Sequence, residues 1–160
     1  MDWLKNIRLV KMKKPKYLYH GSAKKIIGNE LKPRKAHDLE KRAENLHSAV
    51  YASSDKEISL AMAIISCKGV MSASLGFKKK PYGIIFEGWP KQNFIYLYTL
   101  LSDNFVQSKK GSKQWHSIKK VKPVKIEKIK VKDYLYLVRK TSREETKRWL
   151  KKYGLKPFHK

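Results

Sequence analysis

Alternation of apolar and polar side chains in the second half of the chain is the feature that most constrains its fold. In "VKPVKIEKIKV" (121–131) apolar residues alternate with lysines, which is typical of a strand with one buried and one exposed face. The segments "PYGIIFEGW" (81–89) and "NFIYLYTL" (93–100) are also strand-like, and the short polar stretch between them predicts a hairpin. We therefore expect several strands in this half of the chain, two of them joined as a hairpin.

A short buried strand followed by a helix is expected in the first half of the chain. The small and β-branched residues of "AVYAS" (49–53) are typical of a brief buried strand. Asp55 is a suitable N-cap for "KEISLAMAIISC", in which Ile58, Met62 and Ile65 recur at helical spacing. These three side chains are therefore expected to lie near one face of the helix.

The end of the chain has the signals of a second helix. Ser142 and Glu145 have the spacing of a capping box, and "REETKRWLKKY" is helical in composition up to Gly154. Before it, "VKDYLYLV" (131–138) is compatible with a strand or a short helical turn, and "NFVQ" (104–107) with a further strand. Strands with a few segregated helices, without regular β–α alternation, predict an α+β fold.

At 160 residues the chain is expected to form a single domain, with a core over about 15–138 and a C-terminal helix over about 140–154. No apolar run is long enough for a membrane span, so no membrane association is expected. The N-terminal segment, with Trp3, Ile7 and Val10 near one face, resembles a short amphipathic helix rather than a signal peptide. The lone Cys67 favours a buried thiol and a cytoplasmic location.

Positive charge dominates the composition, with 38 basic against 13 acidic residues and a net charge of +25. Such a chain attracts polyanions, and nucleic acid is the first candidate partner. Lysine supplies 32 of the 38 basic residues and arginine only six, a bias that an AT-rich genome or a hot habitat also produces. Because base recognition usually relies on arginine, the surface is interpreted as one that tolerates phosphates rather than one that reads sequence.

Several chemistries have no motif in this chain. CxxC, HExxH and clustered metal-ligand patterns are missing, so no metal site is indicated. Neither the P-loop nor the dinucleotide-binding glycine motif follows a strand. What remains is three separated motifs: "YLYHGS" (17–22), "AVYASSD" (49–55) and "KQWHS" (113–117).

Taken in this order, the motifs resemble the ADP-ribosyltransferases of the histidine–tyrosine–glutamate class. This class includes the poly-ADP-ribose polymerases, the diphtheria-type toxins and the rifamycin ADP-ribosyltransferases. Leu31, Pro33 and Arg34 extend the resemblance, which covers roughly residues 15 to 138. It implies two bent, mainly antiparallel sheets that form a split sandwich with flanking helices, and NAD bound as substrate between them.

The resemblance also implies roles for individual residues. The backbone of Gly21 would pair with the nicotinamide amide at close range, since no Cβ obstructs it. Tyr51 would stack on the nicotinamide ring, and His20 would bind ribose hydroxyls on the adenine side. Ser22 and Ser53, which follow in the same two motifs, would complete the cofactor site. His20, Tyr51 and Gln114 would then be the catalytic residues.

Gln114 departs from the family pattern, because a carboxylate is expected at this position to stabilise the positive charge that develops on the ribose. The amide of a glutamine would only orient the sugar. Glu127 is the other acidic candidate, but its place among lysines favours a surface ion pair. Met62 occupies the position at which the polymerases have a second stacking aromatic residue, so this chain departs from the family pattern there as well.

Other interpretations remain open for these residues and for the chain. His20 could be an ordinary turn histidine, Tyr51 a core tyrosine and Gln114 a loop residue, while His37, His47, His116 and His159 are expected on the surface. Trp89, Trp115 and Trp149 are most simply core or edge aromatics. Two alternative functions are an RNA 2′-phosphotransferase, which would need more converging arginines, and an inactive nucleic-acid-binding module on the same fold.

Overall fold

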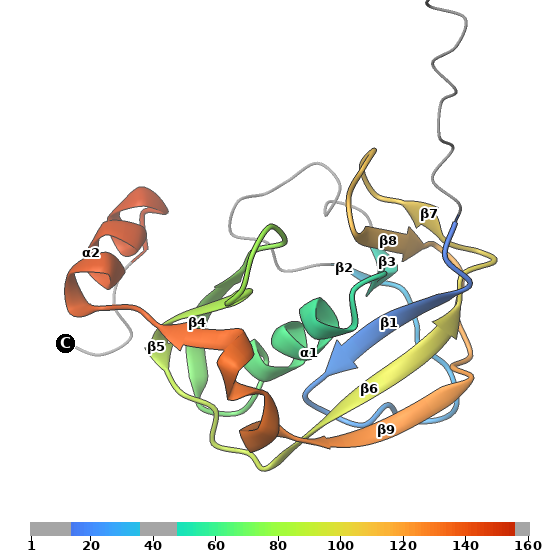
Figure 1. Ribbon diagram of the computed structural model, residues 1–160, viewed down its shortest axis with the longest axis horizontal. Helices are drawn as coiled ribbons and strands as arrows, with labels where there is room; N and C mark the ends of the chain where they lie inside the picture. Colours follow the sequence, from blue (N-terminus) through green and yellow to red (C-terminus); the bar gives the residue numbers. More distant parts are fainter. Residues whose placement is uncertain (1–13, 36–47, 156–160) are drawn as a thin grey trace, which may run out of the picture.

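The computed structural model describes residues 14–35 and 48–155 (Figure 1). The expected N-terminal helix lies outside the described residues, as do His37, His47 and His159. None of the helices in the described ranges is long and apolar enough to cross a membrane.

The architecture is α+β, with two sheets, as expected. The larger sheet has seven strands, ordered β7-β8-β3-β1-β6-β9 with β2 also paired to β3, and its strand pairs are antiparallel. The smaller sheet has the order β10-β5-β4, in which β10 is parallel and β4 antiparallel to β5. The strands are β1 (Tyr17–Ser22), β2 (Arg34–Lys35), β3 (Ser48–Ser53), β4 (Val70–Leu75), β5 (Gly83–Gly88), β6 (Phe94–Leu101), β7 (Val106–Gln107), β8 (Gln114–Ser117), β9 (Lys125–Lys130) and β10 (Val138–Lys140).

Helix α1 (Lys56–Ile65) packs between the two sheets and contacts β1 and β6 on one side and β4 and β5 on the other (Figure 1). The Asp55 carboxylate accepts a hydrogen bond from the Glu57 amide at 2.9 Å, which confirms the expected N-cap. The expected apolar face is wrong in part. Met62 is 41% exposed, whereas Ala61, Ala63 and Ile64 are fully buried, because the helix is enclosed by sheets on more than one side.

The expected hairpin over 81–100 is wrong. β5 belongs to the smaller sheet and β6 to the larger one, so the two segments do not pair with each other. After β5 the chain is held against the turn between α1 and β4: the Trp89 amide donates to the Gly69 carbonyl at 3.1 Å, and the Lys91 amide to the Lys68 carbonyl at 2.7 Å. These hydrogen bonds direct residues 89–93 from one sheet to the other instead of back along β5.

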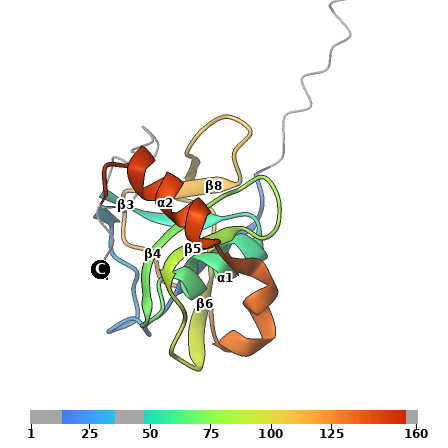
Figure 2. The same ribbon diagram turned by 90° about the vertical axis from the view of Figure 1, so that its left-hand side faces the viewer.

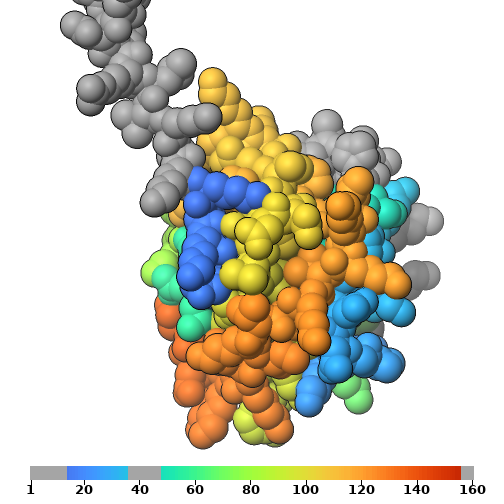
Figure 3. Space-filling model, turned by 90° about the vertical axis from the view of Figure 1, so that its right-hand side faces the viewer, coloured from blue at the N-terminus to red at the C-terminus, as the bar shows by residue number. Residues whose placement is uncertain are grey.

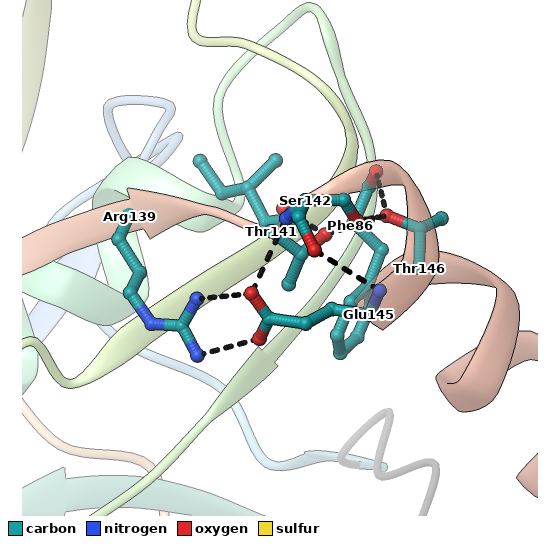
Figure 4. Close-up of polar contacts among 7 residues, drawn as sticks. Phe86, Arg139, Thr141, Ser142, Glu145 and Thr146 are labelled. Carbon is teal, nitrogen blue, oxygen red and sulfur yellow. Dashed lines mark hydrogen bonds and ion pairs between the residues drawn. The ribbon is translucent and has the colours of Figure 1, made fainter.

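The C-terminal elements follow the sequence patterns more closely. The alternating lysine segment contains β9, and the residues after it form the 3₁₀ helix η3 (Val131–Leu137). Helix α2 (Arg143–Lys152) begins with the expected capping box, in which the Ser142 hydroxyl and the Glu145 carboxylate each accept from the other residue's amide (Figure 4). The same carboxylate accepts two hydrogen bonds from Arg139. Figure 2 shows α2 in front of β4 and β5, where Trp149 packs on Phe86 with ring centroids 5.0 Å apart.

Apolar side chains form two clusters, one on each face of the larger sheet. The first surrounds α1 and includes Cys67, whose thiol is buried as expected and whose pKa is raised by burial to about 11. The second lies on the opposite face of β1, β3 and β6 and includes Leu18, Val50 and Tyr98. Successive side chains of β1, β3 and β6 point alternately to the two faces of the sheet and so to the two clusters. This alternation decides on which face each candidate site residue lies.

Candidate functional site

The three sequence motifs lie on three neighbouring strands of the larger sheet. Tyr19 of β1 is opposite Ser53 of β3, and Ser53 is in turn opposite Gln114 of β8. Residues that are far apart in the sequence are therefore adjacent in the strand order β8-β3-β1 (Figure 1). The sheet thus places the three motifs on adjacent strands.

Strand β3 changes partner along its length. β1 is paired with β6 along its whole length, from Tyr17 to Ser22, whereas its pairing with β3 is at Tyr19 and Ser53. The first part of β3 pairs with β2 instead, where Arg34 lies opposite Ala49. Beyond the Tyr19–Ser53 pair, the side chain of His20 connects β1 to β3.

The His20 imidazole makes this connection through a hydrogen bond of 2.7 Å between its Nδ1 atom and the Tyr51 carbonyl oxygen. A carbonyl oxygen can only accept, so Nδ1 carries the proton. In the neutral ring Nε2 is then an acceptor. Nε2 is consequently suited to accept a hydrogen bond from a hydroxyl group.

The surroundings of His20 favour its neutral form. Burial lowers the pKa of His20 below 6.5, the hydrogen bond to the Tyr51 carbonyl opposes this shift, and the Arg34 guanidinium lowers the pKa further. On the β6 side the ring lies 5.9 Å from that of Tyr98, which is fully buried. At neutral pH the imidazole is therefore an uncharged, hydrogen-bonded part of the sheet.

We expect His20 to make the protein less stable in mild acid. Below pH 6.5 the unfolded chain takes up a proton at this residue and the folded chain does not, so the free energy of unfolding falls as the pH drops toward the lower folded pKa. The slope from this one group is at most about 1.4 kcal/mol per pH unit. Urea unfolding between pH 7 and pH 5 measures it, and a smaller slope is expected for His20→Gln. Equal slopes for the two proteins would contradict the assignment.

Tyr51 and Gln114 share one face of the sheet, and the His20 side chain is on the other. Tyr51 is opposite His116 in the β3–β8 pair, and their ring centroids are 6.2 Å apart. The alternate residues Val50 and Ala52 belong to the second apolar cluster, on the face to which Tyr98 and hence His20 point. The imidazole thus reaches Tyr51 through its backbone and not through its phenol ring.

The expectation that His116 lies on the surface is wrong. Its ring is half-buried beside Tyr51, and its Nδ1 atom lies 2.8 Å from the Ser108 hydroxyl. The signal was present in "KQWHS", because residues two apart on a strand share a face and His116 is two residues after Gln114.

Gly21 is required by the packing of α1. A Cβ atom at this position would lie 1.8 Å from the carbonyl oxygen of Ser59. The Ser59 hydroxyl also donates to the Tyr19 carbonyl at 2.8 Å, so this buried serine fixes the helix on β1. Sequence reasoning missed Ser59, although a polar residue inside the apolar run of a helix is a signal for such a hydrogen bond.

The two serines expected in the cofactor site accept hydrogen bonds from the backbone nearby. The Ser22 hydroxyl accepts from the Lys24 amide at 3.2 Å, and the Ser53 hydroxyl from the Asp55 amide at 3.0 Å. Ser53 is also buried. Both hydroxyls therefore stabilise the turns that follow β1 and β3.

Gln114 is the first residue of β8 and is 8% exposed. Next to it, the Lys113 ammonium lies 3.2 Å from the carboxylate of Asp55, which is already bound to the end of α1. Glu127 forms an ion pair with Lys125 at 3.3 Å on the edge strand β9, as expected. Both carboxylates are thus engaged in other interactions, and Gln114 lies on the Tyr51 face of the sheet together with Ser53 and His116.

Comparison with family models, curated proteins and solved structures found no match for this chain.

Proposed function

We propose that the protein binds NAD and acts as an ADP-ribosyltransferase-like domain whose acceptor is a protein or a nucleic acid. The observation that carries this proposal is the arrangement of the three motifs on β8, β3 and β1, with His20 joined to the Tyr51 carbonyl where β3 changes partner. The resemblance in sequence needs these motifs at one site, and this arrangement supports it.

In this proposal the residues would approach a nicotinamide riboside from the two faces of the sheet, beside the hydrogen bond between His20 and the Tyr51 carbonyl. Tyr51 would stack on the flat ring, and Gln114, on the same face, would orient the ribose through its amide. Helix α1 occupies the Cβ side of Gly21, so only the backbone N–H and carbonyl of this residue are left for an amide group. His20 would hold β3 beside β1 through Nδ1 and accept a ribose hydroxyl at Nε2.

In the transfer step the bond between C1′ of the ribose and the nicotinamide nitrogen breaks, and nicotinamide leaves with the electron pair. An oxygen or nitrogen of the acceptor forms the new bond to C1′ and gives up its proton to solvent. The ribose carries positive charge as the bond breaks, and a carboxylate would stabilise this charge more strongly than the Gln114 amide does. Slow turnover is therefore part of the proposal.

The proposal predicts NAD binding that depends on the Tyr51 ring. Tyr51→Ala is expected to weaken binding about tenfold or more, the effect of losing one stacked base, when measured by titration calorimetry. Tyr17→Ala is the control, because it removes a tyrosine ring of the same sheet at the far end of β1. Equal affinities of Tyr51→Ala and the native protein, or no binding of NAD by the native protein, would contradict it.

A second candidate is a binding module without turnover, which the glutamine at position 114 favours. Incubation of the protein with labelled NAD and a panel of DNA, RNA and protein acceptors separates the possibilities. Transfer of label supports the transferase, and retention of nucleic acid without turnover supports the module. Release of phosphate would indicate the 2′-phosphotransferase. The described arginines give that enzyme little support, because Arg139, Arg143 and Arg148 lie in β10 and α2 and only Arg34 is close to His20.

A further inference from the structure

A surface pocket of about 380 Å³ lies apart from the residues of the candidate site. It forms where the segment between β5 and β6 meets the end of β9 and the start of η3. The side chains that matter for its chemistry are Trp89, Asn93, Phe94, Lys130, Lys132 and Leu135. The motifs of β1, β3 and β8 do not line this pocket, so the proposed NAD site does not account for it.

The wall of this pocket is held in place by a network of hydrogen bonds. The Gln92 amide nitrogen donates to the carbonyls of Ala23 and Phe94, each at 2.8 Å, and its oxygen accepts from the Lys68 amide at 2.8 Å. The Val131 amide donates to the Asn93 carbonyl at 2.9 Å, which ties η3 to the same segment. The pocket is therefore preorganised, and a ligand would not have to order it on binding.

Two aromatic rings at this pocket are partly open to solvent. Trp89 is 39% and Phe94 is 37% exposed. The Lys128 ammonium lies 4.3 Å from the centroid of the Phe94 ring, and Lys130 is opposite Phe94 in the β6–β9 pair. Figure 3 shows β9 (orange) beside β6 (yellow). Flat apolar surfaces and positive charges thus occur together.

The charge of the pocket has one sign. Lys130 and Lys132 are its charged lining residues, and both are exposed. The whole chain carries a net charge of +25. A ligand that matches this chemistry has a flat aromatic group beside an anionic group, which is the composition of a nucleotide unit.

We propose that this pocket binds single-stranded nucleic acid, with a base against Trp89 or Phe94 and the adjacent phosphates at Lys130 and Lys132. A single strand is required because the bases of a duplex are stacked on one another and cannot pack on a protein ring. Lysines attract phosphates without reading bases, so binding is expected to depend little on sequence. The inference does not depend on NAD binding, and Tyr51→Ala is expected to leave it unchanged.

The test is fluorescence anisotropy of a labelled oligothymidylate, alone and annealed to its complement, titrated with the full chain. The double variant Trp89→Ala, Phe94→Ala is expected to lower the affinity for the single strand by about tenfold or more. Tyr17→Ala is the control, because Tyr17 is equally exposed and also has a lysine, Lys16, over its ring. Trp89→Phe keeps a ring and is expected to retain most of the affinity.

The lysines are tested by the salt dependence of the affinity, with variants that leave the fold intact because the side chains are exposed. Lys130→Gln, Lys132→Gln is expected to lower the slope of log affinity against log salt by about 0.7 for each phosphate that is no longer neutralised. Lys109→Gln, Lys110→Gln removes the same charge from the loop between β7 and β8 and is expected to keep the slope. The inference is overturned if the aromatic variant is folded and binds normally, if the duplex binds as tightly, or if both lysine pairs act alike.

Discussion

Gly21→Ala is expected to lower the free energy of unfolding by about 3 kcal/mol or more, the upper end of what an extra methyl group costs in a close-packed interior. The added Cβ would lie 1.8 Å from the Ser59 carbonyl oxygen and 3.1 Å from the Ala63 Cβ atom. The first of these neighbours belongs to the backbone of α1, so a change of rotamer cannot relieve the clash. Either α1 moves away from β1 or β1 moves out of the sheet.

Urea unfolding of the variant gives this number, and Gly76→Ala is the matched control. A Cβ atom at Gly76 has its nearest neighbour at 3.8 Å, an ordinary van der Waals distance, so little change in stability is expected there. If Gly21→Ala is as stable as Gly76→Ala, the packing of α1 on β1 described above is wrong. NAD binding measured on the same variant adds to this test, because the Gly21 backbone would be displaced with the strand.

Local structure could be predicted wherever the signal lies in neighbouring residues. The Asp55 N-cap, the Ser142–Glu145 capping box and the alternating strand before η3 are all encoded within a few positions of each other. Each depends on hydrogen bonds or side-chain alternation inside one element. These predictions are confirmed for that reason.

The assignment of strands to sheets could not be predicted in the same way. The segments containing β5 and β6 have the composition and spacing of a hairpin, but each pairs with strands that are distant in sequence. The hydrogen bonds of Trp89 and Lys91 to the turn before β4 decide the outcome. Hydrogen bonds between residues so far apart in the chain leave no periodicity in the sequence. The prediction that Met62 lies on the buried face of α1 is wrong for a similar reason. Which faces of the helix are buried depends on where the two sheets lie, and the helical spacing of apolar residues does not contain that information.

The candidate site shows a similar division. The motifs containing His20, Tyr51 and Gln114 could be identified from the sequence, and the sheet places them on adjacent strands. The opposite directions of the His20 and Tyr51 side chains follow from the register between β1 and β3, which no single motif contains. The packing role of Gly21 likewise depends on where α1 lies.

Gln114→Glu is expected to raise the rate of NAD cleavage by about 10²–10³, the effect of one well-placed electrostatic group at a developing charge. The native amide can hydrogen-bond to a ribose but has no charge with which to stabilise an oxocarbenium-like ribose. At this 8% exposed position a carboxylate loses solvation, so some loss of stability accompanies the gain. Release of nicotinamide from excess NAD, followed by chromatography, measures the rate.

Gln107→Glu is the control, because it adds the same charge to the neighbouring strand β7. Gln107 is opposite Trp115, the residue that follows Gln114 in β8. Only the Gln114 variant is expected to gain activity if the carboxylate acts on the ribose. A general effect of added negative charge on this basic protein would raise both rates together and would contradict the assignment. If Gln114→Glu is folded and binds NAD but does not cleave it, the missing charge is not what limits the reaction. The transferase hypothesis is then rejected, and the hypothesis of a binding module without turnover is kept.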